Sequence, residues 1–366
     1  MIAFTFHANL SSLLENDGNF KNANRKQEIH RNTKSNTRKH DGRIDNTTTV
    51  IIDAIRKMYN GGHLNREYAK YILLQGRDMM AKLPSFCNVS LPTIDDDFKK
   101  RNLSKKRITV VGDIHGNYNN MIHIFRTNGG LPSKDNPYIF NGDLTDKDYQ
   151  GIQCLLTALL IKVYCNECLH LLRGNHELRD YYNGIMKSQV LRVYDEEIWL
   201  IVRDIFNLLP LGIVLDNRIL VVHGGIPSAN ITLNELQSIN RTTDEIFHGN
   251  MTKDQSLIEE LVWAEEDEEN GITVSRRGIY FGPDISKEFL QRNNLEYIIK
   301  GHTYIPKGFR IAHEGRVVTL HSAPSKLSSR DYGAYANIYS NDGSMHIEQF
   351  RRLNQSISID WRSLVP

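Results

Sequence analysis

The sequence predicts an α/β fold whose functional groups lie at the carboxyl ends of its strands. From residue 107 onward, short apolar runs alternate with amphipathic segments, as expected for strands and helices packed in layers. Five of the apolar runs also end beside a glycine and an Asp, Asn or His residue, where open α/β sheets place their chemistry. These five strand-end motifs lie at 112–116, 142–146, 174–177, 223–225 and 301–302.

The strands and helices follow in chain order from these patterns. Apolar spacing indicates a helical hairpin, which packs on the domain that follows it; Gly61 and Gly62 separate its helices, and Pro84 ends the second. The hairpin helices are predicted over 50–58 and 65–82, and a polar connector over 91–106. The predicted strands are 109–111, 137–140, 169–172, 219–222 and 297–299, and the later helices are 120–128, 151–164, 196–209 and 286–293.

One catalytic-size domain is expected over residues 48–353, because this range contains no internal repeat or low-complexity linker. Residues 1–47 are predicted to be a disordered basic tail, since 21–46 has almost no aliphatic residue to offset the entropy of ordering. The basic residues of the tail could serve as a localisation or docking signal, but a solvated tail is the simpler interpretation. Residues 354–366 are predicted to be a C-terminal tail.

The composition is that of a soluble globular protein, with 366 residues of which 40% are hydrophobic and 24% charged. A net charge of +2 is too small to favour nucleic acid or an anionic membrane as a partner. No apolar run approaches the ~18 residues of a membrane span. Four cysteines and no early apolar leader favour a reducing compartment, so we expect a cytoplasmic and/or nuclear location.

Three other features are interpreted as structural. Cys165 and Cys168 have the spacing of a zinc knuckle or redox pair, but no second Cys or His pair follows at finger spacing. The acidic run at 265–269 could bind cations, although a solvated loop is the simpler interpretation. His313 and His321 are interpreted as structural histidines.

The five strand ends supply the ligand types of a two-metal site. Asp113 and His115 stand two residues apart, so both can face one ion from an extended turn. Asp143 could bridge two ions ~3.5 to 4 Å apart, as in sites for in-line phosphoryl displacement. The second ion would then be completed by Asn175, His223 and His302. Taken singly these are ordinary polar loop residues, but five such ends in order favour the metal site, and the absence of thiolate suits Mn²⁺, Fe²⁺ or Zn²⁺.

Three of the motifs together resemble the signature of the phosphoprotein phosphatase (PPP) family of serine/threonine phosphatases. They are Gly-Asp-Ile-His-Gly at 112–116, Gly-Asp-Leu-Thr-Asp at 142–146 and Gly-Asn-His-Glu at 174–177. Arg-Arg-Gly-Ile-Tyr-Phe-Gly at 276–282, His302 and Ser-Ala-Pro at 322–324 continue the resemblance. The segment 65–84 resembles the segment that precedes the catalytic core in the type 5 branch of this family. The tetratricopeptide repeats of that branch are not expected in residues 1–47, which are too few and too polar to form them.

This resemblance implies a metallophosphatase sandwich of two mixed β-sheets flanked by helices. It implies that His176 is the general acid and that Asp146 orients it. The implied ligands are Asp113, His115 and Asp143 for one metal, and Asp143, Asn175, His223 and His302 for the other. The residues expected to bind phosphate are Arg277, Lys147 and Asn175. An arginine suits this role because its planar fork can hold two phosphate oxygens.

The chain departs from the family pattern at three places. Lys147 and Asp148 stand where the family has Arg-Gly, so a fork-shaped cation is replaced by a compact one followed by an acid. Ser-Lys-Leu at 325–327 replaces Asn-Tyr-Cys, which removes a tyrosine beside the substrate pocket. Ala264 and Glu265 replace Ser-Asp. No metal ligand is affected, so we expect a metal-loaded site with an altered grip on phosphate.

The expected function is a serine/threonine phosphoprotein phosphatase that hydrolyses phosphoserine and phosphothreonine by direct attack of a water bridging two metal ions. Its partners would be phosphoprotein substrates and regulatory proteins. Two alternatives stay open: a catalytically weakened, phosphatase-like docking protein, and a two-metal phosphoesterase for small phosphates. The complete set of ligands together with His176 favours turnover over docking.

Overall fold

The computed structural model describes residues 46–94, 106–178, 183–227, 230–242, 251–275, 278–325, 327–353 and 359–366. The strands are β1 (Phe86–Val89), β2 (Arg107–Val111), β3 (Tyr138–Phe140), β4 (Leu169–Leu171), β5 (Gly212–Leu215), β6 (Ile219–Val222), β7 (Glu265–Glu266), β8 (Ile272–Ser275), β9 (Gly278–Phe281), β10 (Tyr297–Lys300), β11 (Phe309–Ala312), β12 (Val317–Leu320), β13 (Tyr332–Tyr339) and β14 (Met345–Arg351). The α-helices are α3 (Asn46–Tyr59), α4 (Arg66–Met80), α6 (Tyr118–Thr127), α7 (Gly151–Tyr164), α9 (Ile185–Val193), α10 (Glu196–Leu208), α11 (Leu233–Gln237), α12 (Lys253–Trp263) and α13 (Pro283–Arg292). The short 3₁₀ helices are η1 (Asn166–Cys168), η2 (Asn175–Glu177), η3 (His313–Gly315) and η4 (Trp361–Leu364).

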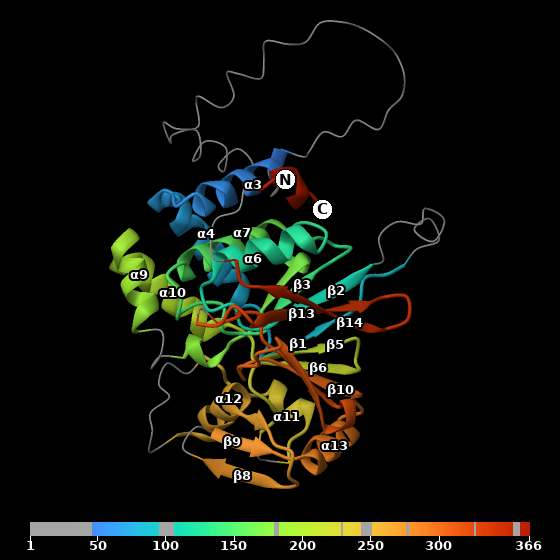
Figure 1. The fold of residues 1–366 in the computed structure, drawn as a ribbon. Helices are drawn as coiled ribbons and strands as arrows, with labels where there is room; N and C mark the ends of the chain where they lie inside the picture. Colours follow the sequence, from blue (N-terminus) through green and yellow to red (C-terminus); the bar gives the residue numbers. More distant parts are fainter. Residues whose placement is uncertain are drawn as a thin grey trace, which may run out of the picture.

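Two mixed sheets pack face to face and form the sandwich expected from the sequence. One has the strand order β1-β5-β6-β10-β12-β11 and the other β14-β13-β2-β3-β4. A small third sheet, β7-β9-β8, was not predicted. Helices α6 and α7 cover the outer face of the five-stranded sheet, and α11, α12 and α13 lie beyond the six-stranded one (Figure 1). The predicted α/β class is confirmed.

The side chains of β6 show how the strands build both layers of the core. Ile219 and Val221 point between the two sheets, whereas Leu220 and Val222 point outward into the cluster that includes α12 and α13. All four residues are buried. A strand buried on both faces has an unbroken apolar run rather than an alternating one, which is why such runs predicted the central strands.

Helices α3 and α4 lie where the helical hairpin was predicted. Asn65 begins α4 by accepting a hydrogen bond from the Tyr68 backbone N–H at 2.7 Å, which satisfies one of the free donors of the first turn. Gly76 lets α4 approach α7 closely, because a Cβ there would lie 2.8 Å from a methyl group of Leu159. Helix α7 is buried on nearly all sides because it lies between this hairpin and the five-stranded sheet.

The ends of the chain only partly test the predicted boundaries. The predicted tail lies outside the described residues except for its last two positions, which begin α3, and the limits at 48 and 353 stay predictions. The described end of the chain packs on the domain: Leu364 is buried, and its carbonyl accepts a hydrogen bond from Leu131 N–H at 2.9 Å. Cys165 and Cys168 form a disulfide just before β4. No helix in the described ranges is both long enough and apolar enough to cross a bilayer.

Candidate active site

The candidate ligands come from the facing ends of both sheets. Strands β2, β3 and β4 are parallel neighbours, so Asp113, Asp143 and Asn175, which follow them, lie at one edge. Strands β6 and β10 are parallel neighbours in the other sheet and place His223 and His302 beside that edge. A hydrogen bond joins the two sheets here, since the His302 backbone N–H donates to Asp113 Oδ1 at 3.0 Å.

Asp143 lies between two groups of ligands. Its Oδ2 is 3.6 Å from Nε2 of His115, and its Oδ1 is 3.3 Å from Nε2 of His223. Residue 174 must be glycine for this placement, because a Cβ there would lie 2.2 Å from Asp143 Oδ1. The carboxylate therefore offers one oxygen to each group, as a bridging ligand must.

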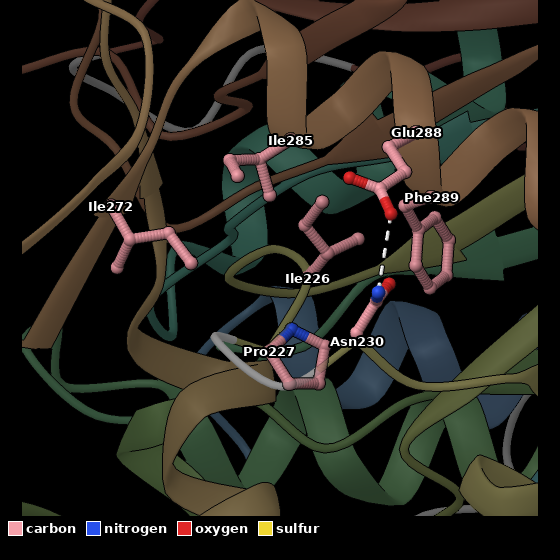
Figure 2. A pocket seen from close by; sticks show the side chains of 7 residues that line it. All are labelled: Ile226, Pro227, Asn230, Ile272, Ile285, Glu288 and Phe289. Atoms are coloured by element: carbon pink, nitrogen blue, oxygen red, sulfur yellow. Dashed lines mark hydrogen bonds between the residues drawn. The ribbon is translucent and has the colours of Figure 1, made fainter.

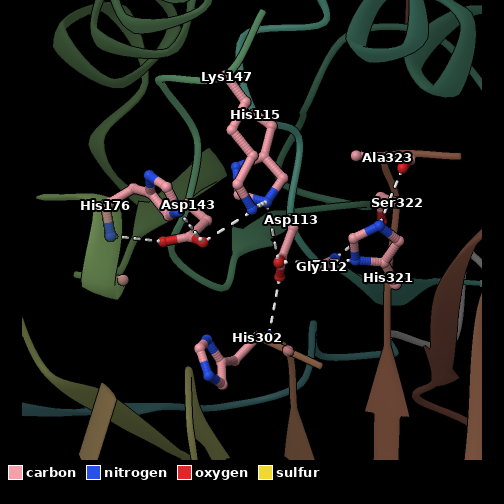
Figure 3. Close-up of polar contacts among 12 residues, drawn as sticks. Gly112, Asp113, His115, Asp143, Lys147, His176, His302, His321, Ser322 and Ala323 are labelled. Carbon is pink, nitrogen blue, oxygen red and sulfur yellow. Dashed lines mark hydrogen bonds and ion pairs between the residues drawn. The ribbon is translucent and has the colours of Figure 1, made fainter. Parts of the chain in front are cut away.

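The first group consists of Asp113, His115 and Asp143. The Nε2 atom of His115 is 3.4 Å from Asp113 Oδ2, a spacing close to that of Asp143 on its other side (Figure 3). Two donors that share one metal at ~2.1 Å lie about 3 to 4 Å apart, so these spacings fit an ion. Burial alone would raise the pKa of Asp113, but the imidazoles of His115 and His321 hold it well below its usual range.

The second group consists of Asp143, Asn175, His223 and His302. Nδ1 of His223 donates to the Asn141 carbonyl at 2.7 Å, so its Nε2 carries a lone pair, which lies 3.0 Å from Asn175 Oδ1. Nδ1 of His302 is also 3.0 Å from that oxygen. Both ring nitrogens therefore converge on the Asn175 amide, which can donate its NH₂ group to them when no ion is bound, or turn its oxygen toward a cation that all three share. Nε2 of His302 lies 3.5 Å from Glu265, a carboxylate that can hold the proton on the outer nitrogen.

His176 and Asp146 form the predicted acid pair beside these groups. Nδ1 of His176 donates to Asp146 Oδ2 at 2.6 Å, and its Nε2 lies 4.0 Å from Asp143 Oδ2. Burial alone would lower the pKa of His176, but the carboxylates of Asp143 and Asp146 raise it. The ring is therefore oriented and kept more basic than usual, with its second nitrogen facing the ligand groups, as a proton donor in this position requires.

The predicted phosphate-binding residues are only partly described. Lys147 Nζ lies 2.7 Å from Nε2 of His115, so its charge sits against a candidate metal ligand. Asp148, the other departure in this loop, pairs with Arg352 at 2.9 Å. Arg277 and Lys326 lie outside the described residues.

The backbone at the site is strained. Five residues with side chains adopt the left-handed region, where a Cβ is unfavourable. They are His115 (φ 52°), Asp143 (φ 48°), Asp146 (φ 70°), Lys147 (φ 50°) and His302 (φ 66°). These are half of the non-glycine residues with positive φ among the described ones, and strain of this kind is common at functional sites.

Glu177 is a site residue whose role the sequence did not reveal. The backbone N–H groups of Asp143 and Gly174 both donate to its Oε2, at 2.8 and 3.0 Å, and the Thr145 hydroxyl donates to Oε1 at 3.1 Å. Burial, with the nearby charge of Asp143, raises the pKa of Glu177 to about 7. Glu177 therefore ties together the loops that follow β3 and β4. The only signal in the sequence was its place at the end of the 174–177 motif.

The interpretation of 265–269 as a solvated loop is wrong for its first two residues. Glu265 and Glu266 form β7, and Glu265 faces His302 as described above. The Glu266 side chain is buried, and its Oε2 forms an ion pair with Lys300 Nζ at 2.9 Å. Lys300 in turn donates to the carbonyl of Gly301 at 3.0 Å. The acidic run thus supports the loop that carries His302.

A separate pocket of about 170 Å³ lies between the loop after β6 and helix α13 (Figure 2). Its lining is largely apolar, and its one polar link joins Asn230 Nδ2 to Glu288 Oε1 at 3.1 Å. None of its lining residues is a candidate ligand. This pocket is therefore distinct from the metal-type cluster.

Comparisons with known proteins agree with this geometry. The model of the calcineurin-like phosphoesterase family matches residues 106–306. Serine/threonine-protein phosphatase 5 of Solanum lycopersicum is 33% identical over 288 residues, which cover 75% of this chain and 48% of that protein. The same-named protein of Rattus norvegicus is 33% identical over 316 residues, which cover 85% of this chain and 59% of that protein.

A solved structure supports the fold. A protein serine/threonine phosphatase from Saccharomyces cerevisiae, described as similar to human phosphatase PP5, aligns with a TM-score of 0.72 at 26% identity and covers 82% of this chain and 94% of its own. The present chain spans about half the length of the curated relatives. Metallophosphatases use two divalent metal ions, and Asp143 is shared by two clusters that could each hold one, Asp143 with His115 and His176 and Asp143 with His223 and His302. The chain belongs to the calcineurin-like phosphoesterase family.

Proposed function

We propose that this chain is a metal-dependent protein serine/threonine phosphatase that hydrolyses phosphoserine and phosphothreonine. The observation that carries the proposal is the position of Asp143, whose two oxygens face separate ligand groups beside the His176–Asp146 pair. The named activity of the relatives, serine/threonine-protein phosphatase, supports the choice of substrate.

When bound, two metal ions supply an activated water and positive charge for the phosphate oxygens. The side chains of this chain do the rest. Asp146 holds His176 with a proton on Nδ1, and the raised pKa of His176 favours a second proton on Nε2. That Nε2–H is positioned to protonate the serine or threonine oxygen as it leaves, so no covalent nucleophile is required.

The ligands we assign are Asp113, His115 and Asp143 for one ion, and Asp143, Asn175, His223 and His302 for the other. This set contains only oxygen and nitrogen donors. Mn²⁺ is the ion we propose for assays, and iron or zinc would suit the same donors. Lys147 and Arg277 are proposed to contact the phosphate, with Asn175 near it.

One assay tests the proposal. The full chain is incubated with added Mn²⁺ and offered a phosphoserine peptide, a phosphotyrosine peptide, p-nitrophenyl phosphate and a dinucleotide. We expect the phosphoserine peptide to be hydrolysed with a higher kcat/KM than the phosphotyrosine peptide or the dinucleotide. Preference for the dinucleotide would support the small-phosphate alternative instead.

A weakened docking protein is the second candidate, and a specific contact favours it. The ammonium of Lys147 lies against His115, where it competes with a metal ion for the same lone pair. In that case the wild-type chain would be inert with Mn²⁺ on every substrate above. Double substitution of Lys147→Arg and Asp148→Gly would then restore turnover if this loop is the lesion.

Phosphoproteins are the substrates we propose, and regulatory proteins are proposed as further partners. The proposed location is the cytoplasm and/or the nucleus, on the composition argument given above. Imaging of the tagged full-length protein in its own cells tests the location.

A further inference from the structure

Strand β8 has the residue pattern of a strand that is covered on one face, yet all four of its residues are exposed. Its sequence, Ile-Thr-Val-Ser, alternates apolar and polar side chains, which is typical of a half-buried strand. Ile272 and Val274 are nevertheless 37% and 76% exposed. These two residues are called the β8 strip below.

The neighbouring strand shows which face of the sheet the β8 strip belongs to. In the antiparallel ladder of β8 and β9, Ile272 pairs with Phe281 and Val274 pairs with Ile279. Directly opposed residues of a ladder have their side chains on the same face of the sheet. Phe281 and Ile279 are buried in the cluster that includes α12 and α13. The face that β9 buries in this core therefore continues onto β8, where Val274 is left mostly open to solvent.

The outer edge of β8 is also open, because β8 is the last strand of the sheet β7-β9-β8 in the part of the chain that the structure describes (Figure 1). The Gly282 N–H donates to the Gly271 carbonyl at 2.8 Å, so these two residues are a hydrogen-bonded pair. Bonded and non-bonded pairs alternate along an antiparallel ladder, so Ile272 and Val274 direct their backbone groups away from β9. The β8 strip therefore offers both the apolar side chains and the backbone groups that an added strand requires.

The apolar pocket described above lies at the first residue of the strip. Ile272 lines this pocket together with Ile226 and Phe289, which are both buried (Figure 2). Its volume of about 170 Å³ is below the range of about 300 to 1,000 Å³ that is typical of sites for small molecules. The pocket is therefore suited to a single side chain of a bound peptide.

The last residue of β8 leads toward the candidate active site. Ser275 pairs with Gly278, where a Cβ would lie 3.1 Å from the Cβ of Trp263. The Trp263 ring packs edge-on against His302, with 5.1 Å between ring centroids. Ile272 and Ser275 are ~10 Å apart along an extended strand, so the path from the pocket to His302 is ~15 Å, or roughly five extended residues.

The surface beside the start of β8 is acidic. Glu268 and Glu269 precede the strand and are exposed. Asp284 is also exposed, and its Oδ1 accepts a hydrogen bond from the Gly271 N–H at 2.8 Å. Complementary charge favours a partner that carries lysine or arginine at this place.

We propose that β8 binds an extended segment of the phosphoprotein substrate, which adds a strand to the outer edge of the sheet. An aliphatic side chain of this segment fills the pocket beside Ile272, and basic side chains lie next to Glu268, Glu269 and Asp284. Main-chain hydrogen bonds supply affinity in such additions, and the pocket supplies specificity. The inference rests on the proposed phosphatase function and specifies its substrates, in which the docking segment lies roughly five residues from the phosphorylated residue.

Phosphoserine peptides with and without a docking segment test the inference. Each extended peptide adds, before or after the phosphoserine, a segment in which aliphatic and basic residues alternate, with its first aliphatic residue about five positions away. The full-length protein is assayed with Mn²⁺, and the docking gain is kcat/KM for the extended peptide divided by kcat/KM for the unextended one. We expect a docking gain of at least ~10-fold for one of the two extensions, and its loss when glutamate replaces the basic residues. No gain with either extension, in a protein that hydrolyses the unextended peptide, would overturn the inference.

Variants of Val274 show whether the gain comes from β8. Val274→Asp makes the strip polar, and Val274→Pro removes an edge N–H without removing a hydrogen bond to β9. Leu200→Asp is the matched control, because Leu200 is an aliphatic residue of α10 with 41% exposure. We expect both Val274 variants to abolish the docking gain and Leu200→Asp to keep it. A gain that persists in both Val274 variants would overturn the inference.

Binding of the extension alone separates failure of docking from failure of the proposed function. A fluorescent extension peptide without phosphoserine is titrated with the full-length protein, and binding is measured by anisotropy. A wild type that binds this peptide but hydrolyses neither phosphopeptide would overturn the proposed function and support the docking surface. Absence of binding, together with a dimer in sedimentation that Val274→Asp dissociates, would assign the strip to a second copy of this chain and overturn the inference.

Discussion

The ammonium of Lys147 lies 2.7 Å from Nε2 of His115, the ring nitrogen that also faces Asp113 and Asp143. A fixed positive charge at this distance opposes the binding of a divalent ion. Lys147 is largely exposed, so water weakens the repulsion to on the order of 1 kcal/mol. This loop therefore places a positive charge where it would repel a bound metal ion.

We predict that Lys147→Met will bind Mn²⁺ about 5-fold more tightly at the position assigned to Asp113, His115 and Asp143, since ~1 kcal/mol corresponds to that factor. Titration of the metal-free protein measures it. Lys134→Met, which removes an exposed lysine paired with Glu167, is the control and should change nothing. Unchanged affinity in Lys147→Met would mean that the ammonium turns away when the ion binds.

Asp143→Asn tests the bridging carboxylate. An amide offers one neutral oxygen in place of two anionic ones, so both ligand groups lose a charged donor. Metal content, measured by elemental analysis, should fall from close to two equivalents to near zero, with loss of turnover. Cys165→Ser, far from the site at the other end of β4, should alter neither quantity. An active variant with both metals would rule out the bridge.

His176→Asn tests the proton donor. Because general acids contribute about 10² to 10⁴ in rate, kcat on a phosphoserine peptide should fall within that range. The fall should be much smaller on p-nitrophenyl phosphate, whose leaving group needs no proton, and metal content should stay the same. If both substrates lose the same factor, His176 has another role.

The buried Glu266–Lys300 pair gives a prediction about pH. Burial alone would raise the pKa of Glu266, but Lys300 and Arg310 lower it to about 2, below its ordinary value of 4.5. Its contribution to folding is therefore present above about pH 4.5 and is lost as the pH falls toward 2. At pH 7, Glu266→Gln should lower the free energy of unfolding by ~3 to 5 kcal/mol, because Lys300 keeps a buried charge without its partner.

Urea unfolding between pH 2 and pH 7 measures this effect. The gap between wild type and Glu266→Gln should narrow as the pH falls through the range from 4.5 to 2. Glu288→Gln is the matched control, because Glu288 pairs with Arg292 on the surface, where solvent screens the pair, and its loss should leave stability nearly unchanged. A gap that does not depend on pH would show that Glu266 acts through packing alone.

Five strands were predictable from the sequence because their residues are mostly buried and a strand-end motif follows each, whereas β5 and β12, which are as fully buried, have no such motif and were not predicted. Strands β3 and β6 are unbroken apolar runs, β2, β4 and β10 are mostly apolar, and each of the five is followed by a strand-end motif. Strand β14 was not predicted, because one of its faces is open to water and its run Met345–Arg351 mixes charged and apolar side chains. The small sheet β7-β9-β8 was hidden for the same reason, since β8 is exposed throughout.

The sequence also identified most candidate site residues, but it could not reveal the contacts that hold them in place. The strand-end motifs marked Asp113 and Asp143 because a short local pattern carries them. His321 has no such pattern, and only the pairing of its backbone with Asp113 from a distant part of the chain reveals its position. Glu266 was hidden by its acidic neighbours, because burial beside Lys300 is a property of the fold rather than of the run.

The positive φ angles at the site lower the stability of the fold at the residues of the proposed catalytic site. His115, Asp143 and His302 each hold a backbone conformation that costs ~1 kcal/mol or more for any residue with a Cβ, and glycine would relieve that cost. Together they cost ~3 kcal/mol or more, a sizeable fraction of a domain's margin of stability of about 5 to 15 kcal/mol. Selection for thermal stability alone would therefore favour glycine at these positions, and the resulting protein would be more stable but would lack the proposed activity. The proposed metal site accounts for side chains at these positions in spite of that cost.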